Sequence, residues 1–379
     1  MDIRISSEAN VIAKKVFAGV KILLVMSFVL AGTKQSSRAQ SKTQRAQQHQ
    51  EVPSFEVDPF WPKPLADRWV TGESGGICTD AHDHIFTINR GDLTPAEQKT
   101  ATASPAVIEF DPVGSIVNSW GDREVLPKGL HSCTVDFQGN IWIGGNQDAI
   151  VQKYTHDGSK MLLQIGTKGA FDTSDGTIAG APMNSSHTFL NLPASIAVDP
   201  TNGDVYIADG YGNRRVIVFD QTGRFLRQWG RQGTVAETDS GMGNVFLKVV
   251  HCVVIGSDGL VYVCDRLGDR VEVFDKMGNF QRNIIVESKT ARLTGVGSAC
   301  WIGFSSDASQ KFLYVGACVD GEVRVIDRAS GEEMSRFGRP GNQTGGFGSV
   351  HTLTVDSKGN IFVADSIGRK IQKWKAIGN

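Results

Sequence analysis

Three histidines stand at the same place in three similar segments of this chain: His131, His251 and His351. Each lies four residues before the apolar residue that is expected to end a short β-strand, and a glycine-containing turn and a second strand follow. If the segments are arranged around one axis, the three imidazoles converge on it. Neutral imidazoles are typical zinc ligands, and three protein ligands with one open position are typical of catalytic zinc. The spacing therefore predicts a Zn²⁺ site at these histidines.

The three segments belong to a longer internal repeat. Its fullest copy, residues 192–230, contains four short runs rich in Val, Ile, Phe or Tyr, separated by Gly, Asn or Asp turns. Shorter copies begin near residues 75, 131, 251, 300 and 351. Six units of four strands predict an all-β fold, a six-bladed β-propeller, rather than a β-sandwich. The last copy has only three strands, so we expect residues 54–57 to supply the fourth and close the ring.

Two arginines and a tyrosine follow the second strand of their repeats: Arg90, Tyr211 and Arg266. In a propeller blade the first strand lines the channel and the second returns antiparallel, so these side chains should share a face with the imidazoles. The arginines could hold a carboxylate by paired hydrogen bonds. Tyr211 could act as a general base, since a metal and guanidinium groups nearby favour a charged phenolate. Alternatively, the arginines pair with Asp92 and Asp269 on the surface, and Tyr211 packs on the next blade.

The other five histidines fall in the predicted tether, turns or loops, and we expect them to be solvated: His49, His82, His84, His156 and His187. Of these, His187 is the one expected nearest the mouth that holds the three ligand histidines.

The first 39 residues are interpreted as a secretory signal peptide. Basic residues precede the apolar run 22–31, and small residues favour cleavage after Ala39. A retained anchor is the alternative, although the run is short for a bilayer span of roughly 20 residues. Residues 40–53 are polar and Gln-rich and predict a disordered tether, which leaves 54–379 for the propeller. We therefore expect a secreted or periplasmic protein without stable membrane insertion after cleavage.

The chain has six cysteines, and export would permit disulfides. Two pairs flank turns between neighbouring strands and could bond across a hairpin: Cys252 with Cys264, and Cys300 with Cys318. Cys78 and Cys133 are interpreted as buried free thiols. Cys300 also takes the place of a histidine in its repeat, so a cysteine-containing metal site is an alternative, and the pairing of all six stays open.

Composition narrows the possible partners. The formal net charge is −1, and the chain has no basic stripe with interleaved aromatic residues, so nucleic acid is not an expected partner. The 43 glycines against 12 prolines suit a fold with many tight turns. A small molecule or peptide with a carboxylate fits the expected site, and the oligomeric state is left open.

These motifs resemble those of the peptidyl-α-hydroxyglycine α-amidating lyases, six-bladed propellers built of NHL-type repeats. The similarity covers roughly residues 72–375. Four matches carry the resemblance. The family's Asp-Gly-Tyr-x-Asn-x-Arg stretch, which contains its catalytic tyrosine, matches residues 209–215, and its Arg-Gly-Asp matches residues 90–92. Its Ala-Asp-Arg matches residues 264–266, with the arginine at Arg266, and its zinc histidines match His131, His251 and His351.

The resemblance implies cleavage of an N-acyl-α-hydroxyglycine, a carbinolamide, to an amide and glyoxylate. Zinc would bind the hydroxyl, Tyr211 would take its proton and an arginine would hold the carboxylate. The family's substrate is made by a hydroxylating monooxygenase, which is not in this sequence. The acyl group of the substrate is therefore left open.

The sequence departs from the family at several positions. Leu130, Val250 and Val350 stand where the family has proline before its channel histidines. Thr352 replaces an aspartate linked to structural Ca²⁺, so calcium is not expected, and Gly212 replaces a disulfide cysteine beside the tyrosine.

Two other functions stay open. A non-catalytic NHL propeller would bind a peptide or carbohydrate on its face and no metal at the histidines. A lactonase or a lyase acting on cyclic esters commonly builds its metal site from Glu, Asp and Asn, and the histidine positions carry no such set.

Overall fold

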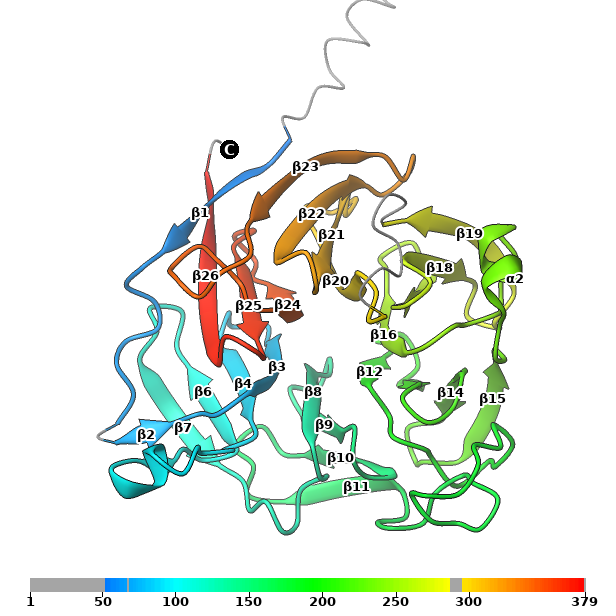
Figure 1. Cartoon of the computed structure of the whole chain (residues 1–379), viewed down its shortest axis with the longest axis horizontal. Coiled ribbons are helices and arrows are strands. Elements are labelled where there is room, and N and C mark those ends of the chain that lie inside the picture. Colours follow the sequence, from blue (N-terminus) through cyan, green and yellow to red (C-terminus); the bar gives the residue numbers. More distant parts are fainter. Residues whose placement is uncertain (1–51, 67, 287–294, 378–379) are drawn as a thin grey trace, which may run out of the picture. The chain divides into compact units, whose positions relative to one another are not determined.

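Six four-stranded antiparallel sheets follow one another around a central axis (Figure 1), which confirms the predicted all-β six-bladed propeller. The computed structural model describes residues 52–377, except residue 67 and residues 287–294. The signal peptide predicted for residues 1–39 and nearly all of the tether predicted for residues 40–53 lie outside the described residues, so both stay predictions.

The blades are named here in chain order. Blade 1 consists of β3 (Ser74–Thr79), β4 (Ile85–Asn89), β6 (Val107–Phe110) and β7 (Ile116–Trp120). Blade 2 consists of β8 (Leu130–Val135), β9 (Ile141–Gly145), β10 (Ile150–Tyr154) and β11 (Met161–Gly166). Blade 3 consists of β12 (Ser195–Val198), β13 (Val205–Asp209), β14 (Arg215–Phe219) and β15 (Phe225–Trp229).

Blade 4 consists of β16 (Val250–Ile255), β17 (Val261–Asp265), β18 (Arg270–Phe274) and β19 (Phe280–Ile285). Blade 5 consists of β20 (Ala299–Phe304), β21 (Phe312–Ala317), β22 (Glu322–Asp327) and β23 (Glu333–Gly338). Blade 6 consists of β24 (Val350–Val355), β25 (Ile361–Asp365), β26 (Lys370–Ile377) and β1 (Ser54–Asp58).

Short elements lie outside the blades: a parallel pair of β2 (Trp69–Val70) and β5 (Thr102–Ala103), the 3-10 helix η1 (Glu97–Lys99) and the helix α2 (Val235–Asp239). Among the described residues, the structure has no helix with the length and apolar character needed to cross a bilayer.

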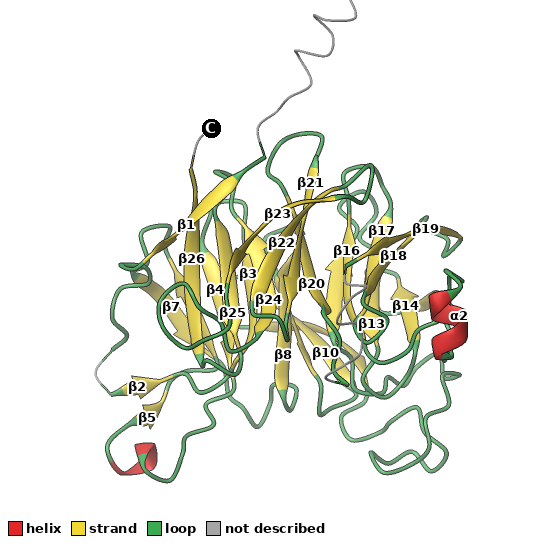
Figure 2. Cartoon of the chain, turned by 45° about the horizontal axis from the view of Figure 1, so that its top comes forward, coloured by secondary structure: helices red, strands yellow, loops and turns green. Residues whose placement is uncertain are grey.

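The middle strands of a blade are buried because neighbouring blades cover both of their faces. Every residue of β13 and β14 is buried, whereas most residues of the outermost strand β15 are only partly buried. Val, Ile and Tyr side chains of these strands pack on the next blade, as Tyr206 and Val218 of blade 3 pack with Val263 and Phe274 of blade 4. The core is thus divided among the blade junctions. The first strands surround the central axis, as predicted (Figure 1), and β8, β20 and β24 lie near the middle of the molecule in the tilted view of Figure 2.

The ring closes in blade 6 by pairing the two ends of the described chain. Strand β1 runs antiparallel to β26, with Ser54 opposite Ile377 and Asp58 opposite Lys373. This confirms that the N-terminal segment supplies the missing fourth strand.

Replacing Phe55 of β1 with Ala should lower the melting temperature by several degrees. Its ring packs 4.7 Å from that of Phe337 and 5.5 Å from that of Tyr314, between blades 6 and 5. The side chain is half-buried, so we expect about 1–3 kcal/mol, below the range for a fully buried Phe. Phe60, 85% exposed, is the matched control. Equal calorimetric melting temperatures for Phe55→Ala and Phe60→Ala would argue against a stabilising closure.

All six cysteines form disulfides: Cys78–Cys133, Cys252–Cys264 and Cys300–Cys318. The latter two cross hairpins, as the sequence indicated. The expectation of free thiols at Cys78 and Cys133 is wrong, because that bond joins the first strands of two blades and no hairpin spacing reveals it. With every thiol paired, the cysteine-containing metal site is also excluded.

Candidate metal centre and its surroundings

The three histidines predicted to bind metal each lie at a break in strand pairing near the start of a first strand. In β8, β16 and β24 the pairing register with the second strand shifts across the histidine: between Leu130 and Ser132, between Val250 and Cys252, and between Val350 and Thr352. Such a β-bulge leaves one residue unpaired and re-aims its side chain. The bulge explains how three residues at one repeat position come to face a common centre.

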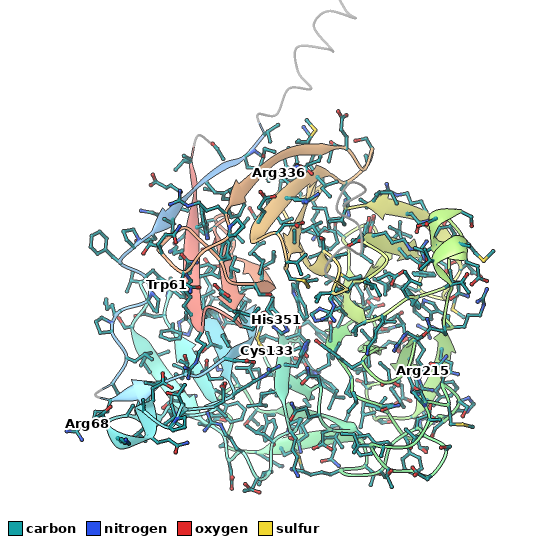
Figure 3. All side chains as sticks on the ribbon, in the orientation of Figure 1. Trp61, Arg68, Cys133, Arg215, Arg336 and His351 are labelled. Carbon is teal, nitrogen blue, oxygen red and sulfur yellow. A yellow bond between two sulfur atoms is a disulfide. The ribbon has the colours of Figure 1, made fainter. Side chains whose placement is uncertain are left out.

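The three imidazoles do converge. The Nε2 atoms of His131 and His351 lie 3.0 Å apart, and the candidate ligand atoms of His131, His251 and His351 all lie within 4.8 Å of one another. All three residues are buried. Figure 3 shows His351 near the middle of the propeller.

Backbone carbonyls fix the orientation of two imidazoles. Nδ1 of His131 lies 2.7 Å from the Ala194 oxygen, and Nδ1 of His251 lies 2.7 Å from the Cys300 oxygen. Because a carbonyl only accepts, both Nδ1 atoms must donate, which leaves the Nε2 lone pairs facing the centre. Metal-bound histidines commonly have this second hydrogen bond. The accepting residues hold the histidine position in the following blade, so alternate blades supply imidazole and carbonyl.

The third imidazole is less constrained. The Gly75 carbonyl favours protonation of His351, yet Nδ1 of His351 makes no hydrogen bond of good geometry with any described residue. Since His131 Nε2 is an acceptor, its 3.0 Å contact with His351 Nε2 needs either a proton or a cation between the nitrogens. Ligands bonded to zinc at about 2.0–2.1 Å in a tetrahedron lie roughly 3.3 Å apart. The donor set therefore suits zinc, and its ligand atoms, all within 4.8 Å of one another, are close enough to share one ion.

Burial keeps these imidazoles neutral at pH 7, the form that binds metal. Burial and then the neighbouring imidazoles and Arg90 hold the pKa of His131 well below its usual range. Burial and then Arg266 do the same for the pKa of His251. Burial, with smaller contributions from both arginines, lowers the pKa of His351 to about 3.

The metal-free protein should lose stability as the pH falls. The folded pKa of His351 lies below its unfolded value of about 6.5, so its contribution is complete above that pH and is lost toward pH 3. For this residue the loss between pH 7 and pH 5 is about 2 kcal/mol. A His351→Asn variant should therefore lose about 2 kcal/mol less in guanidinium unfolding of chelator-treated protein. Identical losses in both proteins would contradict the assignment.

Tyr211 and Arg266 lie at the same centre. The Tyr211 phenol oxygen is 3.0 Å from His131 Nε2 and 3.2 Å from His251 Nε2. Arg266 donates from Nη1 to this oxygen at 3.2 Å, and its guanidinium lies 5.5 Å from the centre of the Tyr211 ring. A second hydrogen bond, from Arg266 Nε to the Val296 carbonyl at 3.1 Å, fixes the arginine. The structure thus places Tyr211 in contact with two imidazoles, and Arg266 in contact with Tyr211.

The loop after β13 places Tyr211 by a close backbone approach. An ideal Cβ on Gly210 would lie 2.0 Å from the Val250 carbonyl oxygen, so only glycine lets this loop press on the start of β16. The buried Asp209 anchors the loop from below, because its carboxylate accepts a 2.9 Å bond from Arg215 Nε. Together these contacts bring Tyr211 to His251 of the next blade.

Arg90 approaches the centre from blade 1. Its Nε donates to the Leu130 carbonyl at 3.0 Å, and its guanidinium forms an ion pair with Glu73. The alternative partner suggested by the sequence, Asp92, instead accepts from the Glu73 backbone N–H at 2.7 Å. A cavity of about 460 Å³ opens beside Arg90 and is lined in part by Arg123 and Lys128. The carboxylates of Glu73 and Asp92 line the same cavity, so its charged lining is mixed.

The other histidines that the structure describes lie away from the three imidazoles. His187 stacks on Phe225, with ring centres 3.9 Å apart. His49 lies outside the described residues. The sequence predicted that His84 and His156 are solvated, and the structure differs. Each contacts a buried carboxylate: His84 contacts Glu109, and His156 contacts Asp80. The sequence around each histidine did not reveal these contacts, because the carboxylates belong to other segments of the chain.

Comparison with known proteins shows which families this chain is similar to. The NHL repeat family matches residues 190–219, within blade 3 and the segment before it. NHL repeat-containing protein 3 of Mus musculus is 25% identical over 344 residues, covering 86% of this chain and 85% of that protein.

Peptidyl-alpha-hydroxyglycine alpha-amidating lyase 2 of Drosophila melanogaster is 27% identical over 277 residues, covering 70% of this chain and 58% of that protein. Peptidyl-glycine alpha-amidating monooxygenase B of Xenopus laevis is 24% identical; the match covers 84% of this chain and only 35% of that protein.

Among solved structures, a streptogramin B lyase aligns with a TM-score of 0.52 at 13% identity, covering 85% of this chain and 98% of that one. This likeness concerns the fold alone. The chain therefore contains a stretch that matches the NHL repeat and, over most of its length, is similar to an NHL repeat-containing protein and to proteins named for α-amidation.

Proposed function

We propose that this protein is a zinc-dependent lyase that cleaves an N-acyl-α-hydroxyglycine-type carbinolamide to an amide and glyoxylate. The observation that carries the proposal is the position of the Tyr211 oxygen, which contacts two converging imidazoles and the Arg266 guanidinium at once. The relatives named as α-amidating lyases support the same class of reaction.

His131, His251 and His351 would hold the metal through Nε2. When bound, zinc supplies a Lewis acid that polarises a substrate oxygen. The carbonyls of Ala194 and Cys300 keep two of the imidazoles turned toward that position.

Tyr211 would move the proton. As a phenolate it takes the proton of the substrate hydroxyl, the O–H electron pair forms the new C=O bond, and the C–N bond breaks. The proton then passes from Tyr211 to the departing amide nitrogen. Atoms and electrons balance without oxidant, reductant or water. Arg266, and Arg90 after it releases Glu73, would hold the substrate carboxylate.

The test is release of glyoxylate from several N-acyl-α-hydroxyglycines, corrected for uncatalysed breakdown. Zinc-loaded protein should release glyoxylate and amide in equal amounts, and chelator-treated protein should not until zinc is restored. Zinc-loaded protein that is inactive on all of them would contradict the substrate assignment. Protein that also binds no metal at the histidines would favour a non-catalytic binding propeller.

Arg266→Lys should lower kcat/KM by about 10–100-fold. A hydrogen bond to a charged group contributes about 1.5–3 kcal/mol, and a lysine cannot reproduce a paired contact with a carboxylate. Arg231→Lys is the matched control, because Arg231 pairs with Glu237 on an exposed surface. The measurement is initial glyoxylate release at low substrate concentration. Equal values for both variants would remove Arg266 from carboxylate binding.

A further inference from the structure

A second group of possible metal ligands lies at the junction of blades 1 and 2, at the opposite end of the first strands from the three imidazoles. Asp80 directly follows β3, Glu109 belongs to β6, and His156 follows β10 of the next blade. One ligand atom from each of these residues lies within 4.8 Å of the others. The set is therefore contributed by three separate segments and two blades.

The two carboxylates are buried without a fixed cation. The side chains of Asp80 and Glu109 are 3% and 5% exposed. Their only ion-pair partners among the described residues are the imidazoles of His84 and His156, which carry charge only when protonated. When ionised, the two carboxylates place two negative charges in a buried position, and each nearby imidazole offsets one of them only when it is protonated. A divalent cation would balance both charges.

The distances suit a bound ion. His156 Nε2 lies 3.1 Å from Asp80 Oδ2 and 3.9 Å from Glu109 Oε1. Donors bonded to zinc at about 2.0–2.2 Å are separated by roughly 3.3–3.5 Å, so both separations from His156 Nε2 lie within a few tenths of an ångström of those expected for bound ligands.

The surrounding contacts already orient both carboxylates. His84 Nδ1 lies 2.6 Å from Glu109 Oε1. The backbone N–H groups of His82 and His84 each donate to Asp80 Oδ1 at 2.8 Å, which leaves Oδ2 turned toward His156. Hydrogen bonds of this kind fix ligating carboxylates at metal sites.

A route from solvent reaches this group. Asp80 and His156 line a cavity of about 720 Å³, together with His82 and residues of blade 2 such as Gln138. The His156 side chain is 41% exposed, so an ion can enter and a water or ligand oxygen can complete its coordination.

We propose that Asp80, Glu109 and His156 bind a divalent cation of the zinc type, with His84 orienting Glu109. One imidazole with two carboxylates is a hard to borderline donor set, suited to zinc or manganese. The ion would tie the turn after β3 to the turn after β10. It is a separate site from the three imidazoles and does not depend on the proposed lyase activity.

The test counts zinc in the full chain after loading and dialysis against metal-free buffer. We expect about two zinc ions per chain in the wild type and about one in His156→Ala and Glu109→Gln. Glu109→Gln keeps the shape of the side chain, which guards against misfolding. His82→Ala, a neighbouring histidine outside the ligand set, should keep the wild-type count. Unchanged zinc in both His156→Ala and Glu109→Gln overturns the proposal.

The His251→Ala background separates this proposal from the lyase site. If both sites exist, that variant retains about one zinc ion, and adding His156→Ala removes it. If only the site proposed here exists, His251→Ala leaves the zinc count unchanged while His156→Ala abolishes binding. Zinc should also raise the melting temperature of His251→Ala by a few degrees and not that of the double variant. No zinc-dependent rise in His251→Ala overturns the proposal.

Discussion

Tyr211→Phe should lower turnover of an N-acyl-α-hydroxyglycine by about 10²–10⁴-fold, the usual contribution of a positioned acid or base. The substitution keeps the ring, which packs edge-on against His131 at 5.1 Å, and removes only the oxygen that contacts the imidazoles and Arg266. Zinc content and melting temperature should change little, because neither metal binding by three imidazoles nor the blade packing needs the phenol.

A matched variant separates this effect from the general loss of a hydroxyl. Tyr314 of β21 in blade 5 packs against Phe55, away from the three imidazoles, so Tyr314→Phe makes the same chemical change at a different site. Turnover by the Tyr314→Phe variant should equal that of the wild type. Undiminished turnover in Tyr211→Phe would remove Tyr211 from proton transfer and leave the metal site standing.

His251→Ala should remove about one zinc ion per chain and lower activity by at least about 10³-fold. A metal that polarises the reacting oxygen supplies several kcal/mol, and about 4 kcal/mol corresponds to 10³ in rate. The variant should remain folded, because the blade junctions rather than the central imidazoles hold the core. Metal analysis and circular dichroism check both expectations. His187→Ala, at a histidine outside the centre, should keep zinc and activity.

If His251→Ala keeps both its zinc and its activity, the assignment of His251 as a metal ligand is wrong. If the variant loses zinc but keeps activity, the metal site is supported and its use in the reaction is excluded.

The repeat made the fold and the central residues predictable. One pattern recurring around a ring gives equivalent places to equivalent positions, so His131, His251 and His351 could be brought together without knowing any distance. The same equivalence placed Arg266 and Tyr211 on that face.

Features that depend on contacts between blades could not be predicted in this way. Cys78 and Cys133 bond because β3 and β8 adjoin, and a spacing of 55 residues does not reveal it. Glu73 pairs with Arg90 although the motif suggested Asp92. The carbonyl of Ala194 orients His131, but a backbone group leaves no signature in residue type.

The closure of the ring also determines how this propeller would respond to mechanical tension. Ser54 and Ile377 are paired, so the two ends of the described chain leave blade 6 at the same end of the β1–β26 ladder. A force that separated these ends would break the hydrogen bonds between β1 and β26 one after another rather than all at once. Peeling would release β1 first, then β26 and β25. His351, on the axial strand β24, would be released last in that blade.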